Sequence, residues 1–289
     1  MSEASNRGKE ARTGGGPTRI TSAKNPRVQR TVRLRQSRER KKTGLFVIDG
    51  LREIQRADEA GIAFEEIFMR PPGDLPLCTS EWLAARRESR NSGDAPCERI
   101  EVSENVFSKL AYGDRNDGII VVARRRQLTV DMVLPPTDEP SLIVIVEGLE
   151  NPGNLGAILR TSDAVGVHAL LLVDAEVDDT NPNVIRASMG AAFSVPVIHA
   201  TPAEAKEWCR SHHIALLAAR VDSEQEYYEV DLRQSVAIVL GNEARGLSDE
   251  WHPPAVTPIG LPMAGLVDSL NVSVTAGVVL YEARRQRAK

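Results

Sequence analysis

The chain has 289 residues, of which 42% are hydrophobic and 26% are charged. A chain of this length forms one large or two medium globular domains, and no apolar run approaches the roughly 20 residues that span a bilayer. Residues 1–17 are polar and lack the apolar stretch of a signal peptide, and the three cysteines lack the spacing of metal ligands. We therefore expect a cytoplasmic protein with reduced thiols, no metal site, no membrane segment and a disordered tail over residues 1–17.

The net charge of −4 argues weakly against a nucleic-acid partner, but the charge is unevenly distributed. Residues 19–42 contain ten basic side chains and one acid, Glu39. Such a block attracts phosphate groups whatever the rest of the surface carries, although charge runs often form only a solvated helix face. We predict that this segment binds RNA through six of its side chains, Lys24, Arg27, Arg33, Arg35, Arg38 and Arg40.

Strands and helices alternate in the first half of the chain. Strands are predicted at residues 45–48, 65–69 and 118–122, and helices at 51–60, at 80–87 with Ser80 as cap, and from the cap Ser103 onward. These elements indicate a compact α/β domain over residues 18–127. The prolines that follow predict a linker over residues 128–140, before a second domain over residues 141–289.

The second half alternates more regularly. Strands are predicted at residues 141–146, 170–173, 214–218 and 236–240, and helices at 155–165, at 202–212 with Thr201 as cap, and at 269–285. This order is typical of a mostly parallel sheet that helices cover on both faces. Because ligands of such sheets bind at the carboxyl ends of the strands, the loops after Val146, Leu240 and Ile259 are the predicted functional loops.

Each of these three loops carries polar groups that have two interpretations. Asn154 and Arg160 are six residues apart and do not share a helix face, yet they can reach one substrate from two sides; a capping Asn and a surface Arg are the alternative. Gly241 directly follows a buried strand, where it lets backbone approach a ligand or simply forms a turn. Ser269 and Asn271 open the last helix, where polar side chains are usually caps.

Taken together, residues 140–285 resemble the SpoU/TrmH family of RNA ribose 2′-O-methyltransferases within the SPOUT superfamily. The resemblance lies in three motifs in order, at residues 154–161, at 240–247, and at 261–263 with 269–273. The stretch 186–191 also looks like the family. The first half resembles the family's N-terminal RNA-binding domain, which is similar to ribosomal protein L30e, through Asn25, Pro26, the basic helix, and residues 44–47 with Gly50.

The resemblance implies a fold and a set of site residues. It implies an L30e-like α/β domain followed by a SPOUT α/β domain with a parallel sheet and a deep trefoil knot, a homodimer, and S-adenosylmethionine as cofactor. By motif, Gly241, Leu261 and Leu270 hold the cofactor, and the catalytic residues are Asn154, Arg160, Glu243, Ser269 and Asn271. Gly153 departs from the family, in which many members carry a bulkier residue.

The chemistry of a ribose hydroxyl fits these residues. This poor nucleophile must be positioned, and must lose its proton as it attacks the methyl carbon. A guanidinium does not lose a proton in proteins, so we interpret Arg160 as a clamp on the adjacent phosphate that lowers the pKa of the hydroxyl, with Glu243 orienting Arg160. No metal is required.

We therefore expect an S-adenosylmethionine-dependent RNA 2′-O-ribose methyltransferase, with ribosomal RNA favoured over transfer RNA because an L30e-like domain suits a kinked or looped RNA. A non-catalytic RNA-binding or ribosome-assembly protein is one alternative, against which the intact trio Arg160, Glu243 and Asn271 argues. A base methyltransferase of the same superfamily is another, although the pair Asn154 and Arg160 fits a ribose hydroxyl better. A Rossmann-type methyltransferase is disfavoured, since no GxGxxG follows the first strand of the second domain.

Overall fold

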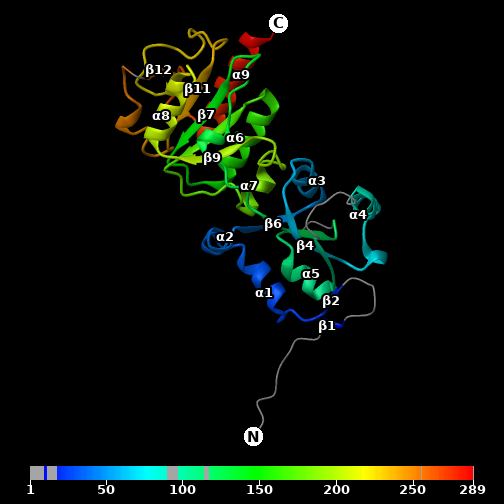
Figure 1. Ribbon diagram of the computed structural model, residues 1–289. Coiled ribbons are helices and arrows are strands. Elements are labelled where there is room, and N and C mark those ends of the chain that lie inside the picture. The colour runs from blue at the N-terminus through cyan, green and yellow to red at the C-terminus, as the bar shows by residue number, and fades with distance from the viewer. Residues whose placement is uncertain (1–9, 12–17, 90–96, 114–116, 255, 289) are drawn as a thin grey trace. The chain divides into compact units, whose positions relative to one another are not determined.

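The computed structural model describes residues 10–11, 18–89, 97–113, 117–254 and 256–288. The chain divides near Arg126 into two compact units, each built on its own six-stranded sheet (Figure 1). The predicted disordered tail lies outside the described residues, apart from a two-residue strand, β1 (Glu10–Ala11). Within the described residues, no helix is long and apolar enough to cross a membrane.

The first unit has a mixed sheet in the order β1-β2-β5-β4-β6-β3. Besides β1, its strands are β2 (Thr18–Ile20), β3 (Leu45–Asp49), β4 (Phe64–Met69), β5 (Glu98–Val102) and β6 (Ile119–Arg124). Its helices are α1 (Pro26–Arg33), α2 (Ser37–Thr43), α3 (Leu51–Glu59), α4 (Leu77–Ser89) and α5 (Glu104–Leu110). Apolar side chains from α1, α5 and one face of the sheet form a buried cluster that includes Val28, Phe68 and Phe107.

The predicted cap of α4 is wrong. Ser80 lies inside this helix, which begins three residues earlier, at Leu77. Its hydroxyl donates to the carbonyl of Pro76 at 3.3 Å, the back-bond that serine makes within a helix rather than at its start. Pro76 directly precedes the helix, and a proline at a helix start was the stronger signal because it lacks the N–H that a helix start leaves unpaired.

The second unit has an all-parallel sheet in the order β12-β10-β11-β7-β8-β9, so the predicted parallel sheet is confirmed. Its strands are β7 (Leu142–Glu147), β8 (Ala169–Val173), β9 (Val197–Ala200), β10 (Ala215–Ala219), β11 (Val236–Leu240) and β12 (Thr257–Ile259). Its helices are α6 (Pro152–Val165), α7 (Pro182–Ala187), α8 (Pro202–Ser211) and α9 (Val272–Arg287).

Both faces of this sheet are covered, because successive side chains of a strand point to opposite faces. Val144 and Val146 belong to a core cluster with residues of α6 and α9, whereas Ile143 and Ile145 belong to a second cluster with Trp208 of α8. Helices on both faces explain why these strands are continuously apolar in sequence.

The stretch predicted as a linker packs against the second unit. It contains a short 3₁₀ turn, Val130–Met132. Leu128, Val130 and Val133 lie against the core cluster on the α8 side of the sheet, while Met132 and Leu134 are exposed. The prolines therefore border a segment that buries apolar side chains, which a composition-based linker assignment does not anticipate.

Candidate active site

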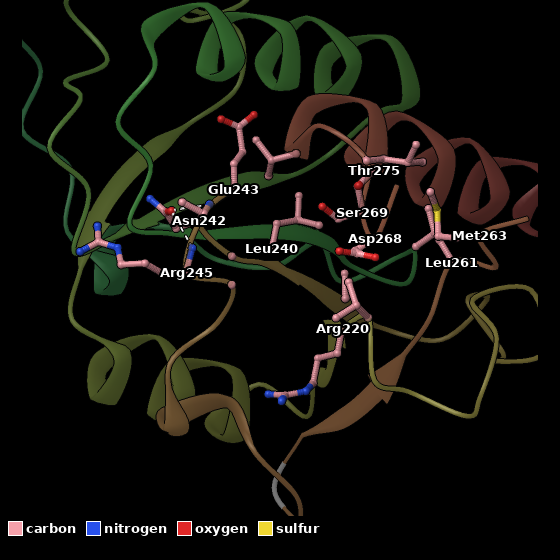
Figure 2. Close-up of a pocket in the computed structure, with 17 residues that line it drawn as sticks. Arg220, Leu240, Asn242, Glu243, Arg245, Leu261, Met263, Asp268, Ser269 and Thr275 are labelled. Carbon is pink, nitrogen blue, oxygen red and sulfur yellow. Dashed lines mark hydrogen bonds between the residues drawn. The ribbon is translucent and has the colours of Figure 1, made fainter. Parts of the chain in front are cut away.

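A cavity of about 360 Å³ lies at the carboxyl ends of β10 and β11 and beside the chain that follows β12 (Figure 2). Among the residues that line it are the three predicted cofactor residues, Gly241, Leu261 and Leu270, and two predicted catalytic residues, Glu243 and Ser269. Thus residues almost thirty positions apart along the chain line the same cavity. This is the end of a parallel sheet at which ligands bind.

Three of the predicted catalytic residues form one hydrogen-bonded cluster. The amide Nδ2 of Asn154 donates to Oε1 of Glu243 at 2.6 Å, and Nδ2 of Asn271 donates to the same oxygen at 2.5 Å. Nδ2 of Asn271 also lies 3.3 Å from Oδ1 of Asn154. The cluster therefore joins the first turn of α6, the loop after β11 and the start of α9. Since both amides donate to Oε1, the other carboxylate oxygen of Glu243 is left without a donor among the described residues.

The orientation of Asn271 follows from its place in the fold. The helix α9 begins at Val272, so Asn271 is its N-cap, and the predicted start at Ser269 is wrong. Its Oδ1 accepts from the backbone N–H of Ser273 at 2.9 Å and from the Ser273 hydroxyl at 2.6 Å. With the oxygen used for capping, the NH₂ group must point the other way, toward Glu243. Capping and the site role are thus two uses of one side chain.

On α6 the capping and site roles fall on different residues. Asn151 is the N-cap, its side chain accepts from Gly153 N–H at 2.7 Å, and Pro152 is the first helical residue. The alternative interpretation of Asn154 as the cap is therefore wrong. Asn154 lies in the first turn, where its side chain is free to reach Glu243.

Arg160 does not join the cluster. Six residues of α-helix turn it about 120° away from Asn154, because each residue adds about 100°. It is exposed and makes no hydrogen bond or ion pair with the described part of the chain. The predicted pairing of Glu243 with Arg160 is therefore wrong, since Oε1 of Glu243 accepts from Asn154 and Asn271 instead. The guanidinium of Arg160 remains accessible to a substrate.

Gly241 is required by its own loop. A Cβ atom at this position would lie 2.5 Å from the backbone carbon of Gly246 and 2.6 Å from the nitrogen of Leu247. The loop doubles back because Asn242 and Gly246 exchange two backbone hydrogen bonds, at 3.1 and 2.8 Å. A side chain at Gly241 would therefore push the two ends of this loop apart rather than simply occupy the cavity.

The cavity also contains a residue that the motifs do not include. Arg220, which follows β10, lines it, although in Figure 2 its side chain extends away from Glu243 and Ser269. Its guanidinium donates to both carboxylate oxygens of Asp222 at 2.9 and 3.0 Å, and this hydrogen bonding holds the pKa of Asp222 below its usual range. No sequence signal marks Arg220, because it lies outside the three motif loops.

The basic segment of the first unit contains side chains with different surroundings. Lys24, Arg33 and Arg38 are exposed, whereas Arg27 forms an ion pair with Glu98 at 2.7 Å. Nη2 of Arg35 donates to the carbonyls of Lys109, Leu110 and Ala111 at the end of α5, at 2.8 to 3.2 Å.

Arg40 is only 2% exposed, and its Nη1 donates to the carbonyls of Leu34 and Arg35 at 2.9 and 2.8 Å. The prediction that Arg40 contacts RNA phosphate is therefore wrong, because burial places its guanidinium out of reach of a phosphate.

The cavity fits S-adenosylmethionine in size and in the chemistry of its lining. Its volume lies in the range of roughly 300 to 1,000 Å³ that is usual for small-molecule pockets. Leu240, Leu261, Leu270 and Val272 offer apolar surface, and the backbone of residues 241–246 offers polar groups at close range. Within the described residues, no group of three or more His, Cys, Asp or Glu side chains is placed to hold a metal.

Comparison with known proteins assigns both halves of the chain. Residues 141–281 match the SpoU rRNA Methylase family, and residues 25–121 match the MRM3-like substrate binding domain. The 23S rRNA (guanosine-2′-O-)-methyltransferase RlmB of Bordetella pertussis is 35% identical over 206 residues, which cover 70% of this chain and 81% of that protein.

Solved structures give the same assignment. The crystal structure of an RNA 2′-O ribose methyltransferase is 40% identical, with a TM-score of 0.76 over 93% of this chain and 99% of that one. The AdoMet-bound rRNA methyltransferase from Sinorhizobium meliloti is 27% identical, with a TM-score of 0.82 over 94% of this chain and 98% of that one.

Proposed function

The chain belongs to the SpoU rRNA methylase family, and from this membership we propose that the RNA on which it acts is ribosomal RNA. It is an S-adenosylmethionine-dependent RNA 2′-O-ribose methyltransferase, as the resemblance of its motifs implied. The relative from Bordetella is named for 23S rRNA, and another from Streptomyces viridochromogenes is named for a uridine of the same RNA. These names support the choice of ribosomal over transfer RNA.

The observation that carries the proposed site is the cluster of Asn154, Glu243 and Asn271 at the edge of the cavity. When bound, S-adenosylmethionine supplies a methyl group made electrophilic by its sulfonium. We assign the backbone near Gly241, together with Leu261 and Leu270, to holding this cofactor. Ser269 lines the same cavity and offers a hydroxyl to the substrate.

We assign to Glu243 the role of receiving the proton of the ribose 2′-hydroxyl. Two amides donate to its Oε1, which leaves Oε2 without a donor among the described residues and available to a substrate hydroxyl. Asn154 and Asn271 orient this carboxylate, since each donates to it. Arg160 cannot take the proton, because a guanidinium stays charged, and its exposed cation instead clamps the phosphate next to the reacting ribose.

The first unit supplies sequence-independent contacts with RNA phosphates. Lys24, Arg33 and Arg38 are exposed, as are the neighbouring Lys41 and Lys42. Arg27 and Arg35 have partners within the unit and take a smaller share. Contacts with phosphate position an RNA without reading its sequence, so base selection belongs to other residues.

The second unit forms a homodimer through an apolar face of α9. Val274 and Tyr281 are seven residues apart, so they lie on one side of this helix, and both are about half exposed, at 50% and 57%. Leu266 and Val267, just before the helix, are exposed as well. Light scattering at micromolar concentration should report a dimer; a fully active monomer would contradict this assembly.

The decisive experiment maps 2′-O-methyl groups in total RNA from cells with and without the gene. We expect a single ribosomal RNA ribose to lose its methyl group when the gene is absent. The purified protein should restore that group on ribosomal RNA from the deletion strain in the presence of S-adenosylmethionine. Loss of a transfer RNA methyl group, with ribosomal RNA unchanged, would contradict the proposed substrate.

A further inference from the structure

Glu147, the last residue of β7, is a buried carboxylate that lies outside the family motifs. It is 7% exposed. One oxygen, Oε2, accepts from the backbone N–H of Ser248 at 2.8 Å. The other, Oε1, accepts from the Ser248 hydroxyl at 2.7 Å and from Nε1 of Trp251 at 2.9 Å. Because burying a carboxylate is costly unless donors surround it, these three hydrogen bonds call for an explanation.

The partners of Glu147 belong to the loop that forms the cofactor cavity. Strands β7 and β11 are neighbours in the sheet, with Val146 opposite Leu240, so the chain leaves both strands at the same edge. Residues 241–246 line the cavity, and Ser248 follows them directly. Nδ2 of Asn242 also donates to the carbonyl of Gly148 at 2.7 Å. The loop after β11 is therefore attached to the end of β7 at both of its ends.

We propose that Glu147 is a positioning residue for methyl transfer, which holds residues 241–248 in the conformation that shapes the cofactor cavity and presents Glu243. This inference rests on the assignment of the cavity to S-adenosylmethionine under Proposed function. Glu147 does not line the cavity and acts through the loop. The attachment is centred on the buried side chains of Glu147 and Trp251, in contrast to the exposed ion pair between Arg245 and Glu150, which contributes little to loop position.

The donor set explains why this position carries glutamate and why glutamine would fail. The N–H of Ser248 and the Nε1–H of Trp251 can only donate, and they point at different oxygens of Glu147. An amide has one accepting oxygen, so glutamine would turn its NH₂ group against one of these two donors in either orientation. The Ser248 hydroxyl raises no such conflict, because it can donate or accept.

This conflict suggests a double-mutant test with Glu147→Gln and Trp251→Phe. Removing the indole N–H lets the glutamine oxygen face the Ser248 N–H while its NH₂ group donates to the Ser248 hydroxyl. Glu147→Gln alone should therefore raise the Kd for S-adenosylmethionine, measured by calorimetry well below the unfolding temperature, by about tenfold or more, the effect of a buried donor left unpaired. In the Trp251→Phe background the same change should raise Kd by less than about threefold.

Arg287 provides a control at the opposite end of the same strands. Its guanidinium donates to the carbonyls of Leu232, Pro140, Ser141 and Gln234, which lie before β11 and β7. Arg287→Gln should lower the unfolding temperature and leave Kd unchanged, so it separates general destabilisation from loss of loop position. If Glu147→Gln alone folds poorly, Trp251→Phe should also restore its folding.

The outcomes distinguish this inference from the proposed cofactor site. An unchanged Kd in Glu147→Gln, or the same rise in Kd with and without Trp251→Phe, would overturn the positioning role alone. A failure of Trp251→Phe to restore a poorly folded Glu147→Gln protein would overturn it as well. A wild-type protein that binds no S-adenosylmethionine would instead overturn the cofactor site, and the inference with it.

Discussion

The basic segment of the first unit and the polar loops of the second unit differ in how well the sequence predicts the role of each side chain. In the basic segment, neighbouring residues of the same type have opposite roles, since Arg38 is exposed and Arg40 is buried against backbone carbonyls. In the loops, Asn154 and Asn271 are 117 residues apart, yet they meet at Glu243. A run of basic residues thus does not predict which of its side chains are exposed. Three motifs in order, in contrast, predict side chains that lie close together in the fold.

We expect the largest effect on activity when Glu243, the central carboxylate of the hydrogen-bonded cluster with Asn154 and Asn271, is changed. Glu243→Gln keeps an oxygen for the two amides but removes the proton acceptor. We expect the single-turnover rate of methyl transfer to fall by about 10²- to 10⁴-fold, the usual contribution of a general base. The Kd for S-adenosylmethionine should change by less than about threefold, because Gln still occupies the same place. A nearly normal rate would remove Glu243 as the proton acceptor.

Arg160 tests whether a motif residue outside the cluster still belongs to the site. Arg160→Ala should reduce the rate by about 10²-fold, the size expected from losing one preorganised charge, and should leave most RNA affinity in place. Arg160→Lys keeps the charge but loses the bidentate fork, so a rate that stays low would point to geometry rather than charge. Turnover of Arg160→Ala close to that of wild type would exclude the phosphate clamp.

Arg40 and Arg38 form a matched pair that tests whether arginines of the basic segment have different roles. Arg40→Gln removes a buried donor from two carbonyls, and we expect the free energy of unfolding of the first unit to fall by about 2 to 3 kcal/mol in a denaturant titration. Arg38→Gln should leave stability unchanged and flatten the slope of log affinity against log salt by about 0.7 to 0.9, the effect of one phosphate contact. The opposite pattern would show that the assigned roles are exchanged.

Removing the cap of α8 should give the smallest effect. The role of this cap depends only on residues that are adjacent in sequence. Thr201 accepts from the N–H of Glu204 at 3.2 Å, and Glu204 accepts from the N–H of Thr201 at 2.8 Å. Thr201→Ala should cost about 1 kcal/mol of stability at neutral pH.

The same cap gives a pH dependence with a definite sign. The backbone and hydroxyl of Thr201 hold the pKa of Glu204 below its usual value, so this carboxylate stabilises the folded state above the unfolded pKa and loses that effect as pH falls through the folded pKa. Thr201→Ala removes the hydroxyl but keeps the backbone N–H, which contributes more to the shift, so the decline of stability below about pH 5 should become only slightly shallower in thermal melts. An unchanged decline would exclude the hydroxyl of Thr201 as a contributor.

Sequence patterns determined the features of this protein that depend on near neighbours. Apolar runs located β7, β8, β10 and β11 of the parallel sheet to within about a residue, whereas no strand was predicted at β9 and no range was given for β12. Thr201 was correctly identified as the cap of α8, whose capping partner Glu204 is three residues away. The three motifs indicated the family and its chemistry, which the comparisons confirm. The trefoil knot remains a prediction from the family.

The tertiary structure alone decided which side chains meet. Glu243 pairs with two asparagines rather than with Arg160, because the turn of α6 carries Arg160 away from Asn154. Arg40 is buried and Glu147 accepts hydrogen bonds from the loop after β11, and neither contact has a signature in the adjacent sequence. The physical reason is that a hydrogen-bonding side chain looks the same in sequence whether its partner is water, substrate or backbone 101 residues away, and only the fold supplies that partner.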